Sequence, residues 1–297
     1  MKNTATLLIT CPDTKGIVAA IADFLYQHNA NILHADQHQD AENNLFLMRV
    51  EWDATGFTLG ESNFNLDEAA FGKAFATIAA KFSMQWQLKL SQHKTRVAIM
   101  VSQYDHCLAD LLHRHKSGEL ACEIPLVISN HRDTEDLVKF YGMDFHYLPV
   151  TKESAVTKDN KAEVEAAQFK LFADYNIDLI VLARYMQILS PDFVQRYPQR
   201  IINIHHSFLP AFIGAKPYHR AFERGVKLIG ATGHYVTEVL DEGPIIEQDI
   251  DRISHRDQVE DLIQKGRDLE RSVLAKAVRW HIENRILLYA NKTVIFD

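Results

Sequence analysis

The sequence has few cysteines, and it lacks both a long apolar run and an excess of basic residues. Its three cysteines, Cys11, Cys107 and Cys122, form no CxxC pair, so we expect free thiols in a reducing compartment. No stretch approaches the ~18 apolar residues of a membrane span. The formal net charge of −7 argues against a nucleic-acid partner, whose phosphates require a basic face. These absences predict a cytoplasmic protein with no membrane and no nucleic-acid partner.

The overall composition is that of a folded protein with room for two domains. Of 297 residues, 47% are apolar and 24% are charged, which is typical of a soluble globular chain. That length exceeds what one hydrophobic core usually supports. The histidines form no ligand set that we expect to hold a metal, so the sequence predicts no metal site.

The first ninety residues predict a small domain of four strands and two helices. Apolar residues alternate along four stretches and recur at helical spacing along two others. In chain order these elements occupy residues 5–11, 17–26, 31–38, 44–52, 68–82 and 84–90. Asp67 is the expected cap of the second helix. The order is βαββαβ, a split βαβ unit of the ferredoxin-like kind.

Two short motifs in this domain lie beside its first and second strands. The first turn reads P-D-x-x-G-I-V over residues 12–18, and N-A-N-I at residues 29–32 precedes the second strand. Together with the βαββαβ order, they resemble an ACT domain. The resemblance implies a regulatory domain that binds a small amino acid through Asp13, Gly16 and Asn31, and that pairs with a second subunit in a homo-oligomer. Ordinary turn chemistry and a helix cap explain Asp13 and Gly16 equally well, so both interpretations stay open.

A short polar joint at residues 91–94 separates this domain, residues 1–90, from a second one at residues 95–297. In the second domain buried strands alternate with helices, which predicts a doubly wound, mostly parallel Rossmann-like sheet of the α/β class. The expected strands lie at residues 95–101, 125–129, 144–150, 177–183, 200–204, 225–236 and 245–250, and a long helix at 257–286 precedes a short strand at 292–296. In such sheets ligands bind at the carboxyl ends of the strands.

The strand at residues 200–204 ends in a cluster of polar side chains. Since side chains alternate along a strand, we expect Asn203 and His205 on one face and His206 on the other. An amide and an imidazole at a strand exit can stabilise an oxyanion or move a proton. A strand end with a hydrogen-bonded histidine is the simpler alternative. We expect His206 to be structural.

The surrounding motif reads N-x-H-x-S-x-L-P over residues 203–210 and L-D-x-G over residues 240–243. This pattern resembles the active site of the folate-dependent formyl-transfer enzymes, and the resemblance covers the whole second domain. It implies that Asn203, His205 and Asp241 are catalytic. The amide and the imidazole would stabilise a tetrahedral intermediate, and the carboxylate would handle the proton.

The same resemblance implies a wider set of site residues. His234 and Ser207 are expected beside the catalytic residues. The residues expected to bind the substrate are Met186, Gln187, Ile188, Leu189 and Gly243. Because 10-formyltetrahydrofolate is itself the substrate in this family, no separate cofactor is expected.

The formyl acceptor is indicated by residues outside these motifs. Family members that act on glycinamide ribonucleotide carry a glycine-rich phosphate loop after their first strand, because only glycine lets the backbone close around a phosphate. The matching residues 102–107 contain no glycine and carry Asp105, which disfavours a phosphorylated acceptor. The acidic net charge disfavours tRNA. Water is then the expected acceptor.

The resemblance therefore implies hydrolysis of 10-formyltetrahydrofolate to formate and tetrahydrofolate, which would supply formate and balance the one-carbon pool. Family members with this activity suggest glycine or methionine as the effector. Two alternatives remain open: a formyltransferase that uses an amine acceptor, and a non-catalytic amino-acid sensor.

Overall fold

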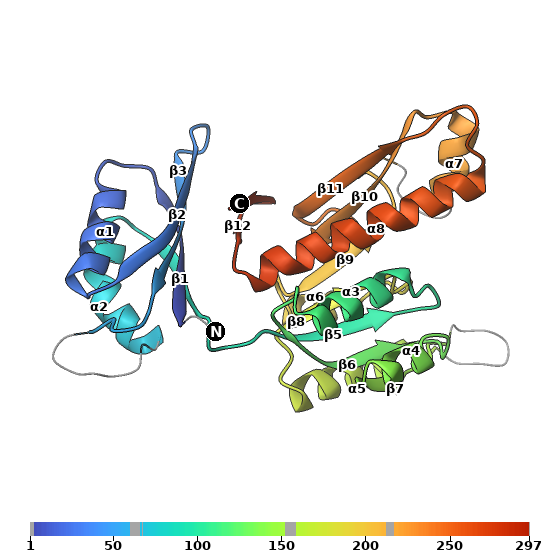
Figure 1. Ribbon diagram of the computed structural model, residues 1–297, viewed down its shortest axis with the longest axis horizontal. Coiled ribbons are helices and arrows are strands. Elements are labelled where there is room, and N and C mark those ends of the chain that lie inside the picture. Colours follow the sequence, from blue (N-terminus) through green and yellow to red (C-terminus); the bar gives the residue numbers. More distant parts are fainter. Residues whose placement is uncertain (1–2, 60–65, 67, 152–158, 212–216, 297) are drawn as a thin grey trace. The chain divides into compact units, whose positions relative to one another are not determined.

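The computed structural model describes residues 3–59, 66, 68–151, 159–211 and 217–296. Asp67, the expected helix cap, lies outside these residues. Two units make up the chain (Figure 1): Met1–Lys94 together with Asn284–Asp297, and Thr95–Glu283. None of the helices in the described part is long and apolar enough to cross a membrane.

The first unit contains a four-stranded antiparallel sheet and two helices. Its elements are β1 (Thr4–Pro12), α1 (Ile17–Gln27), β2 (Asn31–Asp40), β3 (Leu45–Asp53), α2 (Glu68–Lys81), β4 (Gln85–Leu90), β12 (Ile286–Tyr289) and β13 (Lys292–Ile295). The strand order is β2-β3-β1-β4, and β12 and β13 form a separate hairpin. The predicted βαββαβ fold of the ACT-like domain is confirmed.

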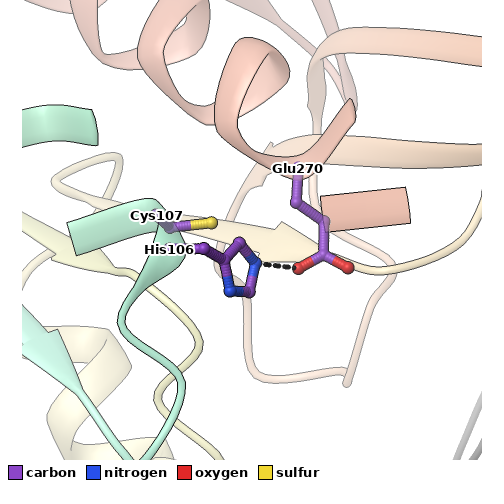
Figure 2. A group of neighbouring side chains, drawn as sticks. All are labelled: His106, Cys107 and Glu270. Carbon is purple, nitrogen blue, oxygen red and sulfur yellow. Dashed lines mark hydrogen bonds and ion pairs between the residues drawn. The ribbon is translucent and has the colours of Figure 1, made fainter. Parts of the chain in front are cut away.

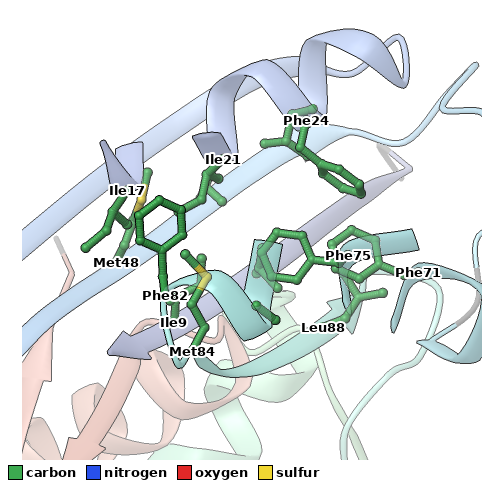
Figure 3. Packing of buried hydrophobic residues seen from close by; sticks show 14 of the residues in the cluster. Ile9, Ile17, Ile21, Phe24, Met48, Phe71, Phe75, Phe82, Met84 and Leu88 are labelled. Carbon is green, nitrogen blue, oxygen red and sulfur yellow. The ribbon is translucent and has the colours of Figure 1, made fainter. Parts of the chain in front are cut away.

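The core of this unit is rich in aromatic side chains (Figure 3). Helix α2 places Phe71, Phe75 and Ala79 in the core because they lie four residues apart, about one helical turn. Phe71 packs against Trp52 of β3 and Trp86 of β4, with ring centroids 6.0 Å and 5.5 Å away. The helical spacing of these residues therefore gives α2 an apolar face, and this face packs against the sheet.

A second, smaller core in this unit is completed by the far end of the chain. Leu287 and Phe296, from the β12–β13 hairpin region, pack against Leu8 of β1 and Leu47 of β3. Since side chains alternate along a strand, Leu8 points away from the aromatic core. The assignment of residues 284–297 to the second domain is corrected, because their apolar side chains bury this face of the first unit.

The second unit is built on a seven-stranded sheet. Its elements are β5 (Arg96–Val101), α3 (His106–Ser117), β6 (Glu123–Ser129), α4 (Glu135–Phe140), β7 (Asp144–Tyr147), α5 (Lys161–Asp174), β8 (Leu179–Leu182), α6 (Pro191–Arg196), β9 (Ile201–His205), α7 (Pro217–Arg224), β10 (Leu228–Tyr235), β11 (Ile245–Arg252) and α8 (Val259–Ile282). The order is β11-β10-β9-β8-β5-β6-β7. The neighbouring strands β9, β8, β5, β6 and β7 are parallel to one another. Strand β10 pairs antiparallel with β9, and β11 pairs antiparallel with β10. The predicted mostly parallel α/β sheet is confirmed.

The direction of the strand order changes beside β5. The chain passes from β5 to β6 and β7 on one side, and later returns to β8 and β9 on the other. At such a switch point the connections diverge and leave a crevice at the carboxyl ends of the strands. The segments that follow β8 and β9 are therefore placed where a ligand binds.

The aromatic core makes a stability prediction. Phe71→Ala should lower the free energy of unfolding of the first unit by about 3–5 kcal/mol, because Phe71 is fully buried and its loss leaves a cavity. Urea unfolding followed by tryptophan fluorescence measures this, since Phe71 contacts two of the three tryptophans. The matched control is Phe140→Ala, whose ring is 73% exposed. Equal midpoints for the two variants would contradict the assignment of Phe71 to the core.

Candidate active site

Two neighbouring strands bring polar side chains together at the end of β9. Antiparallel pairing with β10 sets Asn203 opposite His234, and the Asn203 Nδ2 lies 3.2 Å from the His234 Nε2. The His234 Nδ1 lies 2.9 Å from the Tyr235 carbonyl oxygen. That oxygen only accepts, so Nδ1 carries the proton and Nε2 accepts from the amide of Asn203. The amide is thereby oriented, and its second N–H is left for another acceptor.

Asp241 reaches the same place from the turn after β10. Its Oδ1 is 3.3 Å from the His205 Nδ1 and 3.8 Å from the His234 Nε2. The backbone of Asp241 is left-handed, with φ 58°. A Cβ on Gly243 would lie 1.8 Å from the carbonyl oxygen of Tyr235, so only glycine fits there. The L-D-x-G motif therefore has a steric cause.

The surroundings favour an ionised Asp241 beside two neutral imidazoles. Burial raises the pKa of Asp241, but the hydrogen bond and the charge interaction with His205 outweigh burial, so this pKa lies below its usual value. Burial lowers the pKa of His234. Burial, and then the charge of Arg184, lower the pKa of His206 to about 3. Near neutral pH the site therefore carries the Asp241 charge beside uncharged His234 and His206.

These side chains line a cavity of about 530 Å³. The Nε2 of His205 is buried and has no hydrogen-bond partner among the described residues, so this nitrogen is available to a ligand in the cavity. The predicted substrate-binding residues Met186 to Leu189 line it too. The side chains of Met186 and Ile188 are 53% and 64% exposed, which suits the flat face of a largely apolar ligand.

Two predicted site residues lie beside the cavity. Ser207 and Gly243 are absent from the described residues that line it. The Ser207 hydroxyl donates to the Ala211 carbonyl at 2.7 Å, and the Ser207 carbonyl accepts from the Thr232 hydroxyl at 2.8 Å. Ser207 therefore fixes the turn after β9. Thr232 was missed by the sequence analysis, because a buried threonine within a strand carries no motif.

His206 lies where the sequence did not place it. Its ring centroid is 5.2 Å from that of His205, and both rings line the cavity. The expectation that the two rings face opposite sides was wrong. Strand β9 ends at His205, so the alternation of side chains along a strand no longer applies to the next residue.

A further cluster of His106, Cys107 and Glu270 was also missed (Figure 2). Their donor atoms lie within 4.8 Å of one another, close enough for a metal. However, the Glu270 oxygens already bind protein groups, the His106 Nε2 at 2.8 Å and the Tyr218 hydroxyl at 2.6 Å. Burial, and then the Glu270 charge, hold the pKa of the Cys107 thiol well above its usual value, whereas a metal binds the thiolate. These residues fit a hydrogen-bonded cluster better than a metal site.

Comparison with known proteins identifies the class of this fold and site. Residues 95–278 match the family model described as formyl transferase, and residues 5–56 match that of the ACT domain. The first match covers more than half of the chain and contains every described residue that lines the cavity. The chain therefore belongs to the formyl transferase family.

Within that family, the relatives that match over the whole length include formyltetrahydrofolate deformylases. The deformylase of Synechocystis sp. is 57% identical over 99% of this chain and 98% of its own, and that of Bacillus subtilis is 52% identical over 98% and 93%. The crystal structure of a formyltetrahydrofolate deformylase from Pseudomonas syringae pv. tomato has a TM-score of 0.92 at 47% identity, and the match covers 100% of this chain and 95% of that one. The resemblance seen in the motifs is confirmed.

The shifted histidine makes a prediction about stability and pH. The pKa of His206 falls from 6.5 in the unfolded chain to about 3 in the fold. Between these values the unfolded chain binds more protons, so the free energy of unfolding decreases as the pH is lowered through that window. Relative to His206→Asn, the wild type should lose up to about 1.4 kcal/mol per pH unit there. Urea unfolding of both proteins across this pH range measures the difference, and parallel curves would contradict it.

Proposed function

We propose that this chain hydrolyses 10-formyltetrahydrofolate to formate and tetrahydrofolate. The proposal is supported by full-length similarity to proteins named formyltetrahydrofolate deformylase. The observation that carries it within the site is His205, whose Nδ1 meets a carboxylate while its Nε2 is free at a cavity. The alternatives, an amine-accepting transferase and a non-catalytic sensor, are not favoured by these relatives.

The substrate lies along residues 186–189 and presents its formyl group to Asn203 and His205. The second amide N–H of Asn203, left over after its bond to His234, donates to the formyl oxygen. Such a preorganised donor typically contributes roughly 3–4 kcal/mol as negative charge develops on that oxygen. His234 is a positioning residue, since it holds the amide of Asn203.

Asp241 orients a water against the formyl carbon. The Asp241–His205 pair takes the proton of this water as it attacks, which leaves His205 protonated on both ring nitrogens. The His205 Nε2–H then stabilises the oxyanion. As the bond between the formyl carbon and N10 breaks, a proton passes to N10 from His205, and formate and tetrahydrofolate are released. The low pKa of Asp241 keeps the carboxylate in the form that this step needs.

Replacement of the carboxylate tests this assignment. Asp241→Asn should reduce formate release by about 10²–10⁴-fold, because a general base is lost while the shape of the side chain is kept. Affinity for 10-formyltetrahydrofolate should stay within a few-fold. Glu242→Gln, at an exposed position in the same turn, is the matched control and should retain the wild-type rate. Near-normal turnover by Asp241→Asn would remove this residue from the mechanism.

We also propose that the reaction uses no cofactor beyond the folate substrate, and that the protein works in the cytoplasm. Its three cysteines are free and buried, as in proteins of reducing compartments.

The ACT-like unit indicates a homo-oligomer. Strand β2 forms the edge of its sheet and is exposed along nearly its whole length, including Ile32 and Leu33. An open edge of this kind pairs readily with a second copy.

An amino-acid effector, glycine or methionine, would bind at the start of α1. Gly16 precedes the helix with φ 94° and has no side chain to cap it, so the first-turn amides suit the carboxylate of a ligand. The Asp13 carboxylate accepts from the Gln39 side chain at 2.5 Å and is placed to attract an ammonium group. Asn31 begins the neighbouring exposed strand.

The effector proposal is tested by point variants, because removing residues 1–90 would also strip Leu287 and Phe296 of their partners. Glycine or methionine should change the rate of formate release by about fivefold or more, since an effector must bind two states unequally. Asp13→Ala should abolish the response without altering the rate in the absence of effector. Glu42→Ala, an exposed acid of the same unit, is the control. A wild type that responds to neither amino acid would refute the regulatory role.

A further inference from the structure

One buried carboxylate links side chains from four segments that line the cavity. Glu270 of α8 is 1% exposed. Its Oε2 is 2.8 Å from the Nε2 of His106, the first residue of α3, and 3.4 Å from the Nε of Arg184, which follows β8. Its Oε1 accepts from the hydroxyl of Tyr218 in α7 at 2.6 Å. We call His106, Arg184, Tyr218 and Glu270 the acceptor-end network.

The backbone of α8 is adapted to this network. A Cβ at position 266 would lie 2.1 Å from the hydroxyl oxygen of Tyr218. Gly266 therefore makes room for the ring, and Glu270, about one helical turn further on, accepts the hydrogen bond of the Tyr218 hydroxyl. Glycine inside a helix destabilises it relative to alanine. The fold thus tolerates a weak helical residue in order to hold Tyr218 against Glu270.

Contacts between rings connect the network to the reacting group. The ring of His205 lies 5.2 Å from that of His206, and the latter lies 6.2 Å from that of Tyr218. Residues 186–189 and Leu240 line the same cavity, and the folate of the proposed reaction binds along them. The rest of the lining, which includes the network, is then left for the approach of a nucleophile to the formyl carbon.

We infer that the acceptor-end network excludes amines from the formyl group and leaves water as the nucleophile. An amine acceptor brings substituents that need space and polar partners there. His106 lines this part of the cavity, and the Glu270 oxygens are already in contact with His106, Arg184 and Tyr218. A buried polar group that is already paired offers no hydrogen bond to an amine ligand, whereas a water molecule fits in a small space. The inference rests on the proposed hydrolysis and explains its choice of acceptor.

Shortening His106 opens the space while Glu270 keeps Arg184 and Tyr218 as partners. In the opened site an amine nitrogen attacks the formyl carbon, the bond from that carbon to N10 breaks, and the proton lost by the amine passes through the Asp241–His205 pair to N10. The products are an N-formyl amine and tetrahydrofolate. No other reactant is needed.

The experiment supplies the full chain with 10-formyltetrahydrofolate and glycinamide, and quantifies formate and N-formylglycinamide by mass spectrometry. The wild type should release formate only. His106→Ala should raise the share of formyl groups that reaches the amine by about 10–100-fold, the range expected when a pocket loses a small group. His106→Ser is a second variant suited to the first turn of a helix. His113→Ala, an exposed histidine of the same helix, is the matched control and should behave as the wild type.

The outcomes separate this inference from the proposed function. Formate from the wild type, with formylated amine from either folded His106 variant, supports both. Formate alone from both folded variants overturns the role of the network and leaves the hydrolysis intact. A wild type that formylates glycinamide as readily as the variants also overturns the inference. A wild type that releases no formate without the amine refutes the proposed function.

Discussion

The geometry of the cavity depends on one backbone carbonyl, that of Tyr235. The turn that carries Asp241 can form only because Gly243 passes against this oxygen without a side chain. The same oxygen accepts the Nδ1–H of His234, which fixes the tautomer that holds the amide of Asn203. Displacement of this carbonyl would therefore disturb the carboxylate and the oxyanion donor together, so the two groups act as one preorganised unit.

Local patterns predicted most of the fold because the spacing of apolar residues within a short segment shows which of its faces is buried. The apolar run at residues 95–101 became β5, a central parallel strand that is buried on both faces. The helical spacing of Phe71 and Phe75 became the inner face of α2. Asn203, His205 and Asp241 were found because they lie in short motifs with fixed spacing, and the turn that carries Asp241 tolerates little change in sequence. The structure brings these three together, and their catalytic roles stay a proposal.

What the sequence could not predict comes from contacts between distant segments. His106 and Glu270 are separated by 164 positions, and nothing near either residue signals the other. The hairpin at the end of the chain was missed for a related reason. Its short apolar stretches, around Leu287 and Phe296, resemble a helix end followed by a lone strand until their partners in β1 and β3 are known. His206 was misplaced because alternation was extended one residue beyond the strand.

The hairpin β12–β13 makes the first unit discontinuous in the chain, with the whole second unit inserted between its two parts. During synthesis, residues 95–283 leave the ribosome before the hairpin does. The catalytic sheet can thus form while Leu8 and Leu47 are still uncovered. The unit that we propose to be regulatory is made first and completed last, so a polypeptide whose synthesis stops early would hold the catalytic residues without a finished regulatory core.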